Sequence, residues 1–218
     1  MVNKQKQKGF TLVELIVVLV ILGVLAALLV PALTGYIEKS RKNAVIADTR
    51  AITQAAQTEL SMAYATDAFQ KVKQESMSTG GRANPFIVAS KDGQGAGHIQ
   101  NVVAGAEDRY KDMVNLSEVA SLKDGKGGRV AVWADHSGVV QFTVYDSGKG
   151  YLGVYCAEDG EIEAIQKEKA NHGDTNYADS YLQSNGDKLV VLYTDDMSKG
   201  RAREFIYSCL GIPTSQSS

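Results

Sequence analysis

One acidic side chain lies inside the longest apolar stretch of this chain of 218 residues. Glu14 follows Gly-Phe-Thr-Leu-Val at residues 9–13, and apolar residues then run to Leu33 without another charged side chain. An ionisable group at the centre of a bilayer costs about 2.5 to 3.5 kcal/mol on insertion scales, so such groups are candidates for function. Glu14 is therefore the leading candidate residue, and its position indicates a role in assembly.

A second group of residues has the types found in a hydrolase triad. Asp135, His136 and Ser137 are consecutive, and adjacent side chains point apart, so they cannot line up as orienting acid, base and nucleophile. Together with Gly138 they match a turn between two strands. We predict no catalytic residue here and no enzymatic activity for the chain.

The sequence also lacks the pattern of a metal or cofactor site. Gly93, Gly95 and Gly97 are not followed by the lysine of a phosphate-binding loop. The acidic turn at residues 158–163 lacks the spacing of an EF-hand, so a solvated turn is favoured over a calcium site. The histidines have no metal-ligand spacing to the cysteines. We therefore predict neither a metal nor a cofactor.

Composition and charge indicate one globular domain beyond Leu33. Hydrophobic residues at 44% and charged residues at 22% are typical of a folded protein. The net charge of -2 argues against nucleic-acid binding, which depends on clustered basic side chains. The densest cluster is Lys39, Arg41 and Lys42, which we interpret as a solvated helix face near lipid head groups.

Residues 10–33 form an apolar segment of 24 residues. At a rise of 1.5 Å per residue this helix is roughly 36 Å long, enough to cross a hydrocarbon core of about 30 Å. A secretory signal peptide has a shorter apolar part and ends at a small-residue cleavage site, which this segment lacks. We predict a transmembrane helix, but basic residues on both flanks leave its orientation open.

Gly23 and Pro31 weaken the helical propensity of this segment. Glycine is a poor helix former, and Pro31 lacks an N–H donor while its ring crowds the carbonyl of Ala27. The helix can therefore bend or open between them. A packing notch at Gly23 and a simple kink at Pro31 are equally compatible with the sequence.

Beyond Pro31 the helical pattern continues in amphipathic form to about Gln74. A second helix is expected at residues 107–122, and β-rich runs between turn residues such as glycine predict strands. Successive hairpins predict an antiparallel sheet whose apolar face the amphipathic half of the long helix covers, so the fold class is α+β. The strands are expected at residues 85–89, 130–133, 139–145, 151–156, 161–165 and 188–193.

The two cysteines, Cys156 and Cys209, are compatible with one disulfide or with two separate buried thiols. We favour the disulfide if this part of the chain lies outside the cytoplasm. Cys209 belongs to an apolar piece at residues 204–210, which we expect to be tied down near the end of the chain.

The residues around Glu14 resemble a known family. The sequence KGFTLVELI at residues 8–16, with basic residues ahead and an apolar helix behind, is similar to the prepilin signature of type IV pilins and related pseudopilins. The resemblance covers residues 8–42, and the short leader resembles the type IVa branch. A long helix followed by an antiparallel sheet agrees with the lollipop shape of these proteins.

The resemblance implies how the amino terminus is processed. Prepilin peptidase would cut between Gly9 and Phe10, which would remove residues 1–9 as a leader on the cytoplasmic face and leave an N-methylated Phe10. Residues 10–33 would be the membrane and assembly helix, and residues 34–218 a head outside the cytoplasm. A disulfide between the two cysteines would be chemically permitted there.

The resemblance also implies roles within the apolar helix. Glu14 would pair with the amine of Phe10 on an adjacent copy, and the segment from Gly23 to Pro31 would be the part that loses helical structure in a filament. Physical reasoning supports the first role, because an amine and a carboxylate buried together cost far less than either one alone.

The expected function is that of a structural subunit of a type IV pilus that supports adhesion or motility. The expected partners are further copies of the chain, prepilin peptidase, the pilus assembly machinery of the cytoplasmic membrane, and host or abiotic surfaces. The protein would reside in the cytoplasmic membrane and then in a pilus at the cell surface. The alternatives are a pseudopilin of a type II secretion or DNA-uptake machine and a membrane-tethered monomeric binding domain.

Overall fold

Helix α1 (Leu12–Tyr64) is the longest element of the protein. In the computed structural model, residues 9–66, 85–95, 101–123, 126–135, 137–170, 177–191 and 202–212 are described. Two compact units, Met1–Arg41 and Lys42–Ser218, share α1. The predicted long helix is confirmed, but it ends before Ala65 rather than near residue 74, and residues 67–74 lie outside the described ranges.

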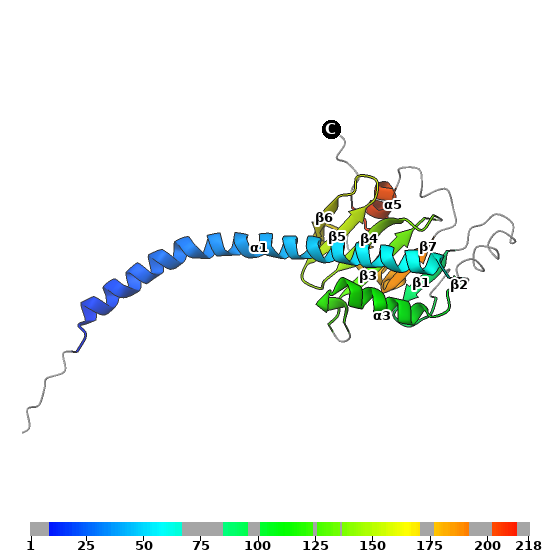
Figure 1. The fold of residues 1–218 in the computed structure, drawn as a ribbon. Coiled ribbons are helices and arrows are strands. Elements are labelled where there is room, and N and C mark those ends of the chain that lie inside the picture. Colours follow the sequence, from blue (N-terminus) through cyan, green and yellow to red (C-terminus); the bar gives the residue numbers. More distant parts are fainter. Residues whose placement is uncertain are drawn as a thin grey trace, which may run out of the picture. The chain divides into compact units, whose positions relative to one another are not determined.

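The second unit contains a mixed sheet in the order β2-β1-β7-β3-β4-β5-β6 (Figure 1). From β3 to β6 the strands form consecutive antiparallel pairs, as the hairpin pattern predicts. Strand β7 instead pairs in parallel with β3, and β2 in parallel with β1, which departs from the expected antiparallel sheet. The strands are β1 (Phe86–Ser90), β2 (Asn101–Val102), β3 (Arg129–Ala134), β4 (Val140–Asp146), β5 (Tyr151–Cys156), β6 (Ile162–Gln166) and β7 (Lys188–Val191).

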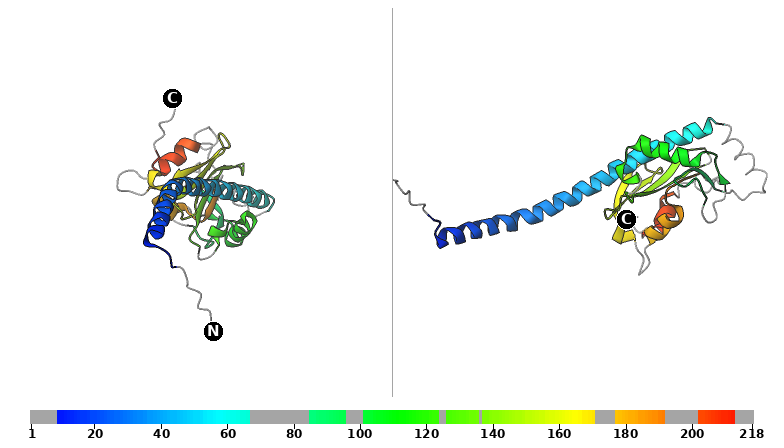
Figure 2. Two further views of the ribbon diagram at one scale, coloured as in Figure 1. Left: turned by 90° about the vertical axis from the view of Figure 1, so that its left-hand side faces the viewer. Right: turned by 90° about the horizontal axis from the view of Figure 1, so that it is seen from below.

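Helices cover both faces of this sheet, with α1 and α3 on one side and α4 and α5 on the other (Figure 2). The prediction of a single covered face is therefore wrong. The helix expected at residues 107–122 is confirmed in part, because it is interrupted at Glu118, whose φ of 56° caps α3. The shorter helices are α3 (Ala106–Ser117), η1 (Ala120–Leu122), η2 (Lys167–Ala170), α4 (Tyr177–Asn185) and α5 (Ala202–Cys209).

Each face of the sheet has its own apolar core. Ile52, Leu60 and Met113 are fully buried between the sheet and the helices α1 and α3. Phe142 and Ile206 are fully buried on the face that α4 and α5 cover. Because both faces are buried, the central strands are apolar at consecutive positions and do not alternate with polar residues.

Polar contacts fix the second half of α1 on the sheet. The Gln57 amide donates to the carbonyl of Gly138 at 2.8 Å and accepts from the N–H of Val140 at 3.0 Å. One turn earlier, the hydroxyls of Thr53 and Thr143 lie 2.9 Å apart. These directional bonds define the register of α1 on the β3–β4 hairpin, which apolar packing alone specifies less strictly.

Close approach between α1 and β5 depends on Gly153. A Cβ atom at this position would lie 1.8 Å from the hydroxyl oxygen of Thr49 and 3.0 Å from a methyl group of Val45. Glycine is therefore required where the helix crosses the strand. At the start of the same strand, the ammonium of Lys42 adds a second contact and lies 5.6 Å from the centre of the Tyr151 ring.

Candidate functional site

Glu14 belongs to a capping box at the start of α1. Its Oε2 atom accepts hydrogen bonds from the backbone N–H of Thr11 at 2.8 Å and from the Thr11 hydroxyl at 2.7 Å. The N–H of Glu14 lies 3.3 Å from that hydroxyl oxygen in return. Such reciprocal bonds satisfy two donors that a helix start leaves free. Within the described residues, Oε1 of Glu14 has no partner and remains available to a further group.

The bond between Gly9 and Phe10 lies outside the helix. Both residues precede the cap, have no regular secondary structure and are exposed. The helix thus begins just after the predicted cleavage site and leaves the bond between Gly9 and Phe10 outside it. Residues 1–8 of the predicted leader, residues 1–9, lie outside the described ranges, so cleavage itself stays a prediction.

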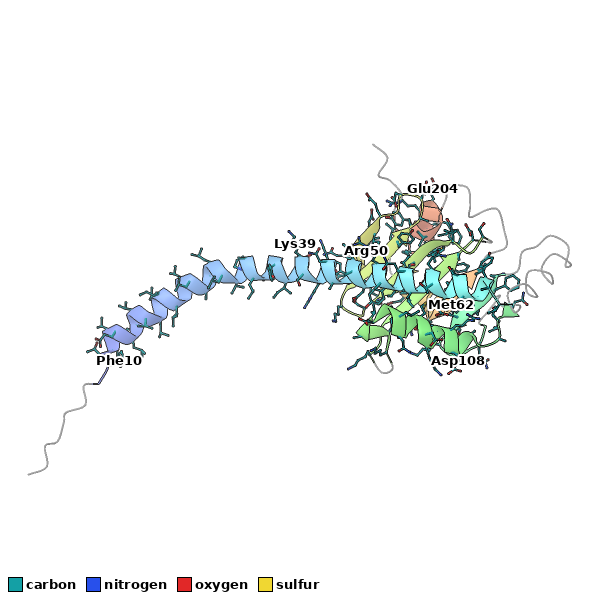
Figure 3. The ribbon with its side chains drawn as sticks, viewed as in Figure 1. Phe10, Lys39, Arg50, Met62, Asp108 and Glu204 are labelled. Carbon is teal, nitrogen blue, oxygen red and sulfur yellow. The ribbon has the colours of Figure 1, made fainter. Side chains whose placement is uncertain are left out.

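The first half of α1 presents an apolar surface that its own unit does not cover. Large hydrophobic side chains from Phe10 to Leu33 are between 47% and 88% exposed. Figure 3 shows that side chains project from all sides of the helix between the labelled Phe10 and Lys39. The helix is long and apolar enough to cross a membrane. A surface of this kind requires lipid or other protein chains around it.

The segment from Gly23 to Pro31 is helical in the structure. A Cβ atom at Gly23 would meet nothing within 4 Å, so no contact in this chain requires glycine there. Three residues after Pro31, the Thr34 hydroxyl donates to the carbonyl of Val30 at 2.9 Å, a bond that commonly bends helices. The predicted loss of helical structure in a filament is not tested by a single chain and stays a prediction.

The two cysteines are free thiols in the structure. Cys156 ends β5 and is buried, and Cys209 in α5 packs against the same apolar cluster. Burial raises the pKa of the Cys156 thiol to about 11 and also raises the pKa of Cys209. Both are therefore unreactive thiols here. The favoured disulfide is not formed, and its formation under oxidising conditions stays a prediction.

Asp135 forms a turn, as predicted. Its Oδ1 atom accepts from the N–H groups of Ser137 at 2.8 Å and Val139 at 3.0 Å, and its Oδ2 atom accepts from the Gln141 amide at 2.8 Å. His136 lies outside the described residues. Because these bonds occupy the carboxylate, Asp135 stabilises the β3–β4 hairpin.

The acidic turn between β5 and β6 holds helix α5. Arg203 forms ion pairs with Asp159 and, at 3.2 Å, with Glu163, and the Tyr207 hydroxyl donates to Glu163. Within the described residues, no group of three acidic, histidine or cysteine side chains is arranged to hold a metal ion. The turn therefore has a structural role in tying down the residues near the end of the chain.

Comparison with known proteins identifies the amino-terminal segment. A family model described as the prokaryotic N-terminal methylation motif matches residues 4–30. The type II secretion system core protein G of Klebsiella pneumoniae is 54% identical over 48 residues, which are 22% of this chain and 34% of the relative. The corresponding protein of Escherichia coli (strain K12) is 52% identical over 50 residues, 23% of this chain and 34% of the relative.

Fimbrial proteins share the same segment. The type IV major fimbrial protein FimA of Dichelobacter nodosus is 42% identical over 55 residues, 25% of this chain and 35% of the relative. The chain thus spans about one third of the length of the curated relatives it matches. No solved structure matches it. Secretion and fimbrial proteins both carry the segment around Glu14, so the match does not separate them.

Proposed function

We propose that this type IV pilin-like protein is the structural subunit of a pilus, cut between Gly9 and Phe10 by prepilin peptidase and assembled through α1. The observation that carries the proposal is the setting of Glu14. Its carboxylate uses one oxygen to cap its own helix and stands at the start of an apolar surface that its own unit leaves exposed. Cleavage before Phe10 would create the cationic amine that such a carboxylate needs when it is buried.

Pairing between Glu14 and the amine of an adjacent copy would set the register of assembly. Leucine, isoleucine and valine side chains are nearly interchangeable along the first half of α1. Apolar contacts between such helices therefore oppose axial slips only weakly. One buried charge pair penalises every slipped register, as a single buried polar residue does in coiled coils.

The remaining parts of the proposal follow from this assembly. The apolar half of α1 holds the unassembled subunit in the cytoplasmic membrane, and the assembled subunits form a surface filament that supports adhesion or motility. The partners are further copies of the chain, prepilin peptidase and the assembly machinery. We propose no enzymatic activity, since a structural subunit needs none.

A pseudopilin of a type II secretion or DNA-uptake machine is the second candidate function. It is favoured by the higher identity to core protein G, 54% over 48 residues against 42% over 55 residues for FimA. Electron microscopy of cells that lack the protein separates the two candidates. Loss of long surface fibres supports the pilus, whereas intact fibres with a defect in secretion or DNA uptake support the pseudopilin.

A membrane-tethered monomeric binding domain is the candidate from a different class. It gives no role to a carboxylate inside the apolar helix, although an acid near the membrane boundary is inexpensive if it reaches the head groups. Chemical cross-linking at native abundance tests it, because a tether yields monomers only.

Analysis of the amino terminus tests the proposed processing. Protein purified from cells should begin at an N-methylated Phe10, as intact-mass and peptide analysis would show. A chain that retains residues 1–9 while the cells make fibres from other subunits would contradict the proposal.

A further inference from the structure

One end of the sheet in the second unit is strongly basic. Arg129 begins β3, and Lys149 lies in the turn between β4 and β5, three residues after the residue that pairs with Arg129. Lys123 and Lys126 precede β3 in a loop joined by the bond from the Lys126 N–H to the Lys123 carbonyl at 3.1 Å. All four side chains are exposed. We call these residues the basic end.

Asp146, the residue that pairs with Arg129 across the β3–β4 hairpin, is engaged by other groups. Asp146 is buried, and its Oδ2 atom lies 2.7 Å from the ammonium of Lys167, which also pairs with Asp179. Its Oδ1 atom accepts from the N–H of Gly148 at 2.7 Å. Asp124 lies outside the described residues. Within the described residues, none of the four basic side chains forms an ion pair, so their charge faces solvent.

The opposite end of the same strands is acidic. The turn from β5 to β6 carries Glu158, Asp159 and Glu161, all exposed. Arg203 pairs with Asp159 and with Glu163 on β6, but it does not reach the two exposed glutamates. Within the part of the chain that the structure describes, Glu158 and Glu161 have no basic partner. We call residues 158–161 the acidic end.

The two ends cannot meet within one molecule. A strand of six residues such as β5 is roughly 20 Å long, and the β4–β5 turn and the β5–β6 turn lie at its opposite ends. Two copies, however, can place the basic end of one against the acidic end of the next. Such a head-to-tail contact uses two different surfaces of each copy. Repeating it adds copies to an open filament, unless the rotation between copies closes the assembly into a ring.

We propose that the basic end of one head binds the acidic end of the next copy in the filament. This inference rests on the proposed function, and it adds a directional contact between heads to the pairing at Glu14. An anionic membrane surface would also attract the basic end, but it gives no role to the acidic one. A second copy accounts for both ends, and opposite potentials on facing surfaces guide association and fix orientation.

Charge reversal tests the contact. One variant combines Lys123→Glu, Lys126→Glu, Arg129→Glu and Lys149→Glu and so makes both ends acidic, and the other combines Glu158→Lys with Glu161→Lys and makes both ends basic. Each variant alone should lower filament yield by about tenfold or more, because like charges then face each other at every contact. Co-expression of the two variants should restore filaments, because each end then meets an opposite charge on the other chain.

A control variant reverses charge away from both ends. Arg50→Glu with Lys111→Glu reverses two exposed basic residues on helices α1 and α3 and should leave the yield within about twofold, since distant exposed charges are largely screened. Denaturation followed by the fluorescence of Trp133, the one tryptophan, verifies that every variant folds. Filaments from either reversal variant alone, at the parental yield, would overturn the proposal.

Cross-linking separates failure of this contact from failure of the proposed function. A zero-length carbodiimide cross-linker applied to mixed labelled and unlabelled full-length chains should join Lys149 of one chain to Glu158 or Glu161 of the other. Filaments without these cross-links would overturn the contact and retain the pilus. Loss of yield on reversing only the basic end, together with binding to vesicles of acidic lipid, would assign that end to a membrane surface instead.

Discussion

The two halves of α1 have the same secondary structure and opposite surroundings. Up to Arg41 the helix belongs to a unit that leaves its large apolar side chains exposed, whereas from Lys42 it contributes Ile52 and Leu60 to a closed core. Residues 12–33 of the first half carry one acid, Glu14, among apolar residues, and the second half is held by directional polar bonds such as those of Gln57. Only the second half has its apolar side chains buried by other residues of the same chain.

This difference indicates where the first half finds its stability. Burying a large apolar side chain fully contributes about 1.5 to 3 kcal/mol, and the first half gains only part of this within its unit, because its side chains stay exposed. Under the proposed function, lipid would supply the burial before assembly, and neighbouring copies would supply it in a filament. Substitutions in the two halves should therefore affect different measurements, namely unfolding of the head and assembly.

The largest expected effect comes from making the same substitution, leucine to alanine, in each half of α1. Leu60→Ala should lower the free energy of unfolding of the head by roughly 3 kcal/mol, because it leaves a cavity in the core. Leu19→Ala, in the exposed first half, should leave that free energy within about 0.5 kcal/mol of the parent value. Denaturation of the full chain in detergent, followed by Trp133 fluorescence, measures both. Equal losses of unfolding free energy in the two variants would contradict the difference between the two halves of α1.

A glycine pair gives the next largest effect. Gly153→Val should destabilise the head by about 2 kcal/mol, because the new side chain meets Thr49 and Val45. Gly35→Ala is the control, since a Cβ atom there meets nothing within 4 Å and alanine favours the helix. The same denaturation experiment applies. A tolerated valine at residue 153 would show that α1 does not approach β5 as closely as described.

Two glutamines test the polar bonds of the second half. Gln57→Ala should cost about 1 to 2 kcal/mol of stability, because the carbonyl of Gly138 and the N–H of Val140 lose their partner. Gln54→Ala, on the exposed side of the same helix, should change stability by less than about 0.5 kcal/mol. If both variants behave alike, apolar packing alone holds the helix.

The smallest expected effect depends on pH. Burial, and then the nearby Asp112, raise the pKa of Glu59 above its ordinary value of 4.5, and Arg109, 3.7 Å away, offsets this only in part. The stabilising contribution of the neutral carboxyl is therefore complete below pH 4.5 and is lost as the pH rises through the raised pKa. Glu59→Gln should stabilise the head slightly more at pH 7 than at pH 4.

The control for this prediction is Glu204→Gln, an exposed residue of α5. Its effect on the unfolding free energy should be small at both pH values, because the side chain is exposed. A Glu59→Gln variant that is destabilised more at pH 7 than at pH 4 would show that the pair with Arg109 outweighs the burial of the charge.

Much of the fold follows from the sequence because local patterns suffice for it. Runs rich in β-branched and aromatic residues between turn residues predict β3 to β6, where neighbouring strands are also consecutive in the chain. The parallel pairing of β7 with β3 does not follow, since β7 is reached through α4. Among the described residues of α4, Ala178, Tyr181 and Leu182 belong to the apolar cluster of the sheet, and this short pattern is too weak to recognise in the sequence.

The residues of interest likewise fall into those that a local sequence pattern predicts and those that it does not. Glu14 is evident because a charge in an apolar helix is rare, and the spacing from Thr11 to Glu14 matches a capping box that the sequence alone could have revealed. The roles of Gln57 and Gly153 depend on strands far along the chain, so no local pattern predicts them.

Assembly of Glu14 variants tests the central claim most directly, with Thr11→Val as the control that weakens the helix cap by about 1 kcal/mol but keeps the carboxylate. Intact-mass analysis first verifies that each chain begins at Phe10. Processed Glu14→Ala chains should remain in the membrane with filament yield reduced by about tenfold or more, since the amine stays unpaired when it is buried, whereas Thr11→Val chains should assemble. Filaments from processed Glu14→Ala chains at the parental yield would contradict the claim that this carboxylate directs assembly.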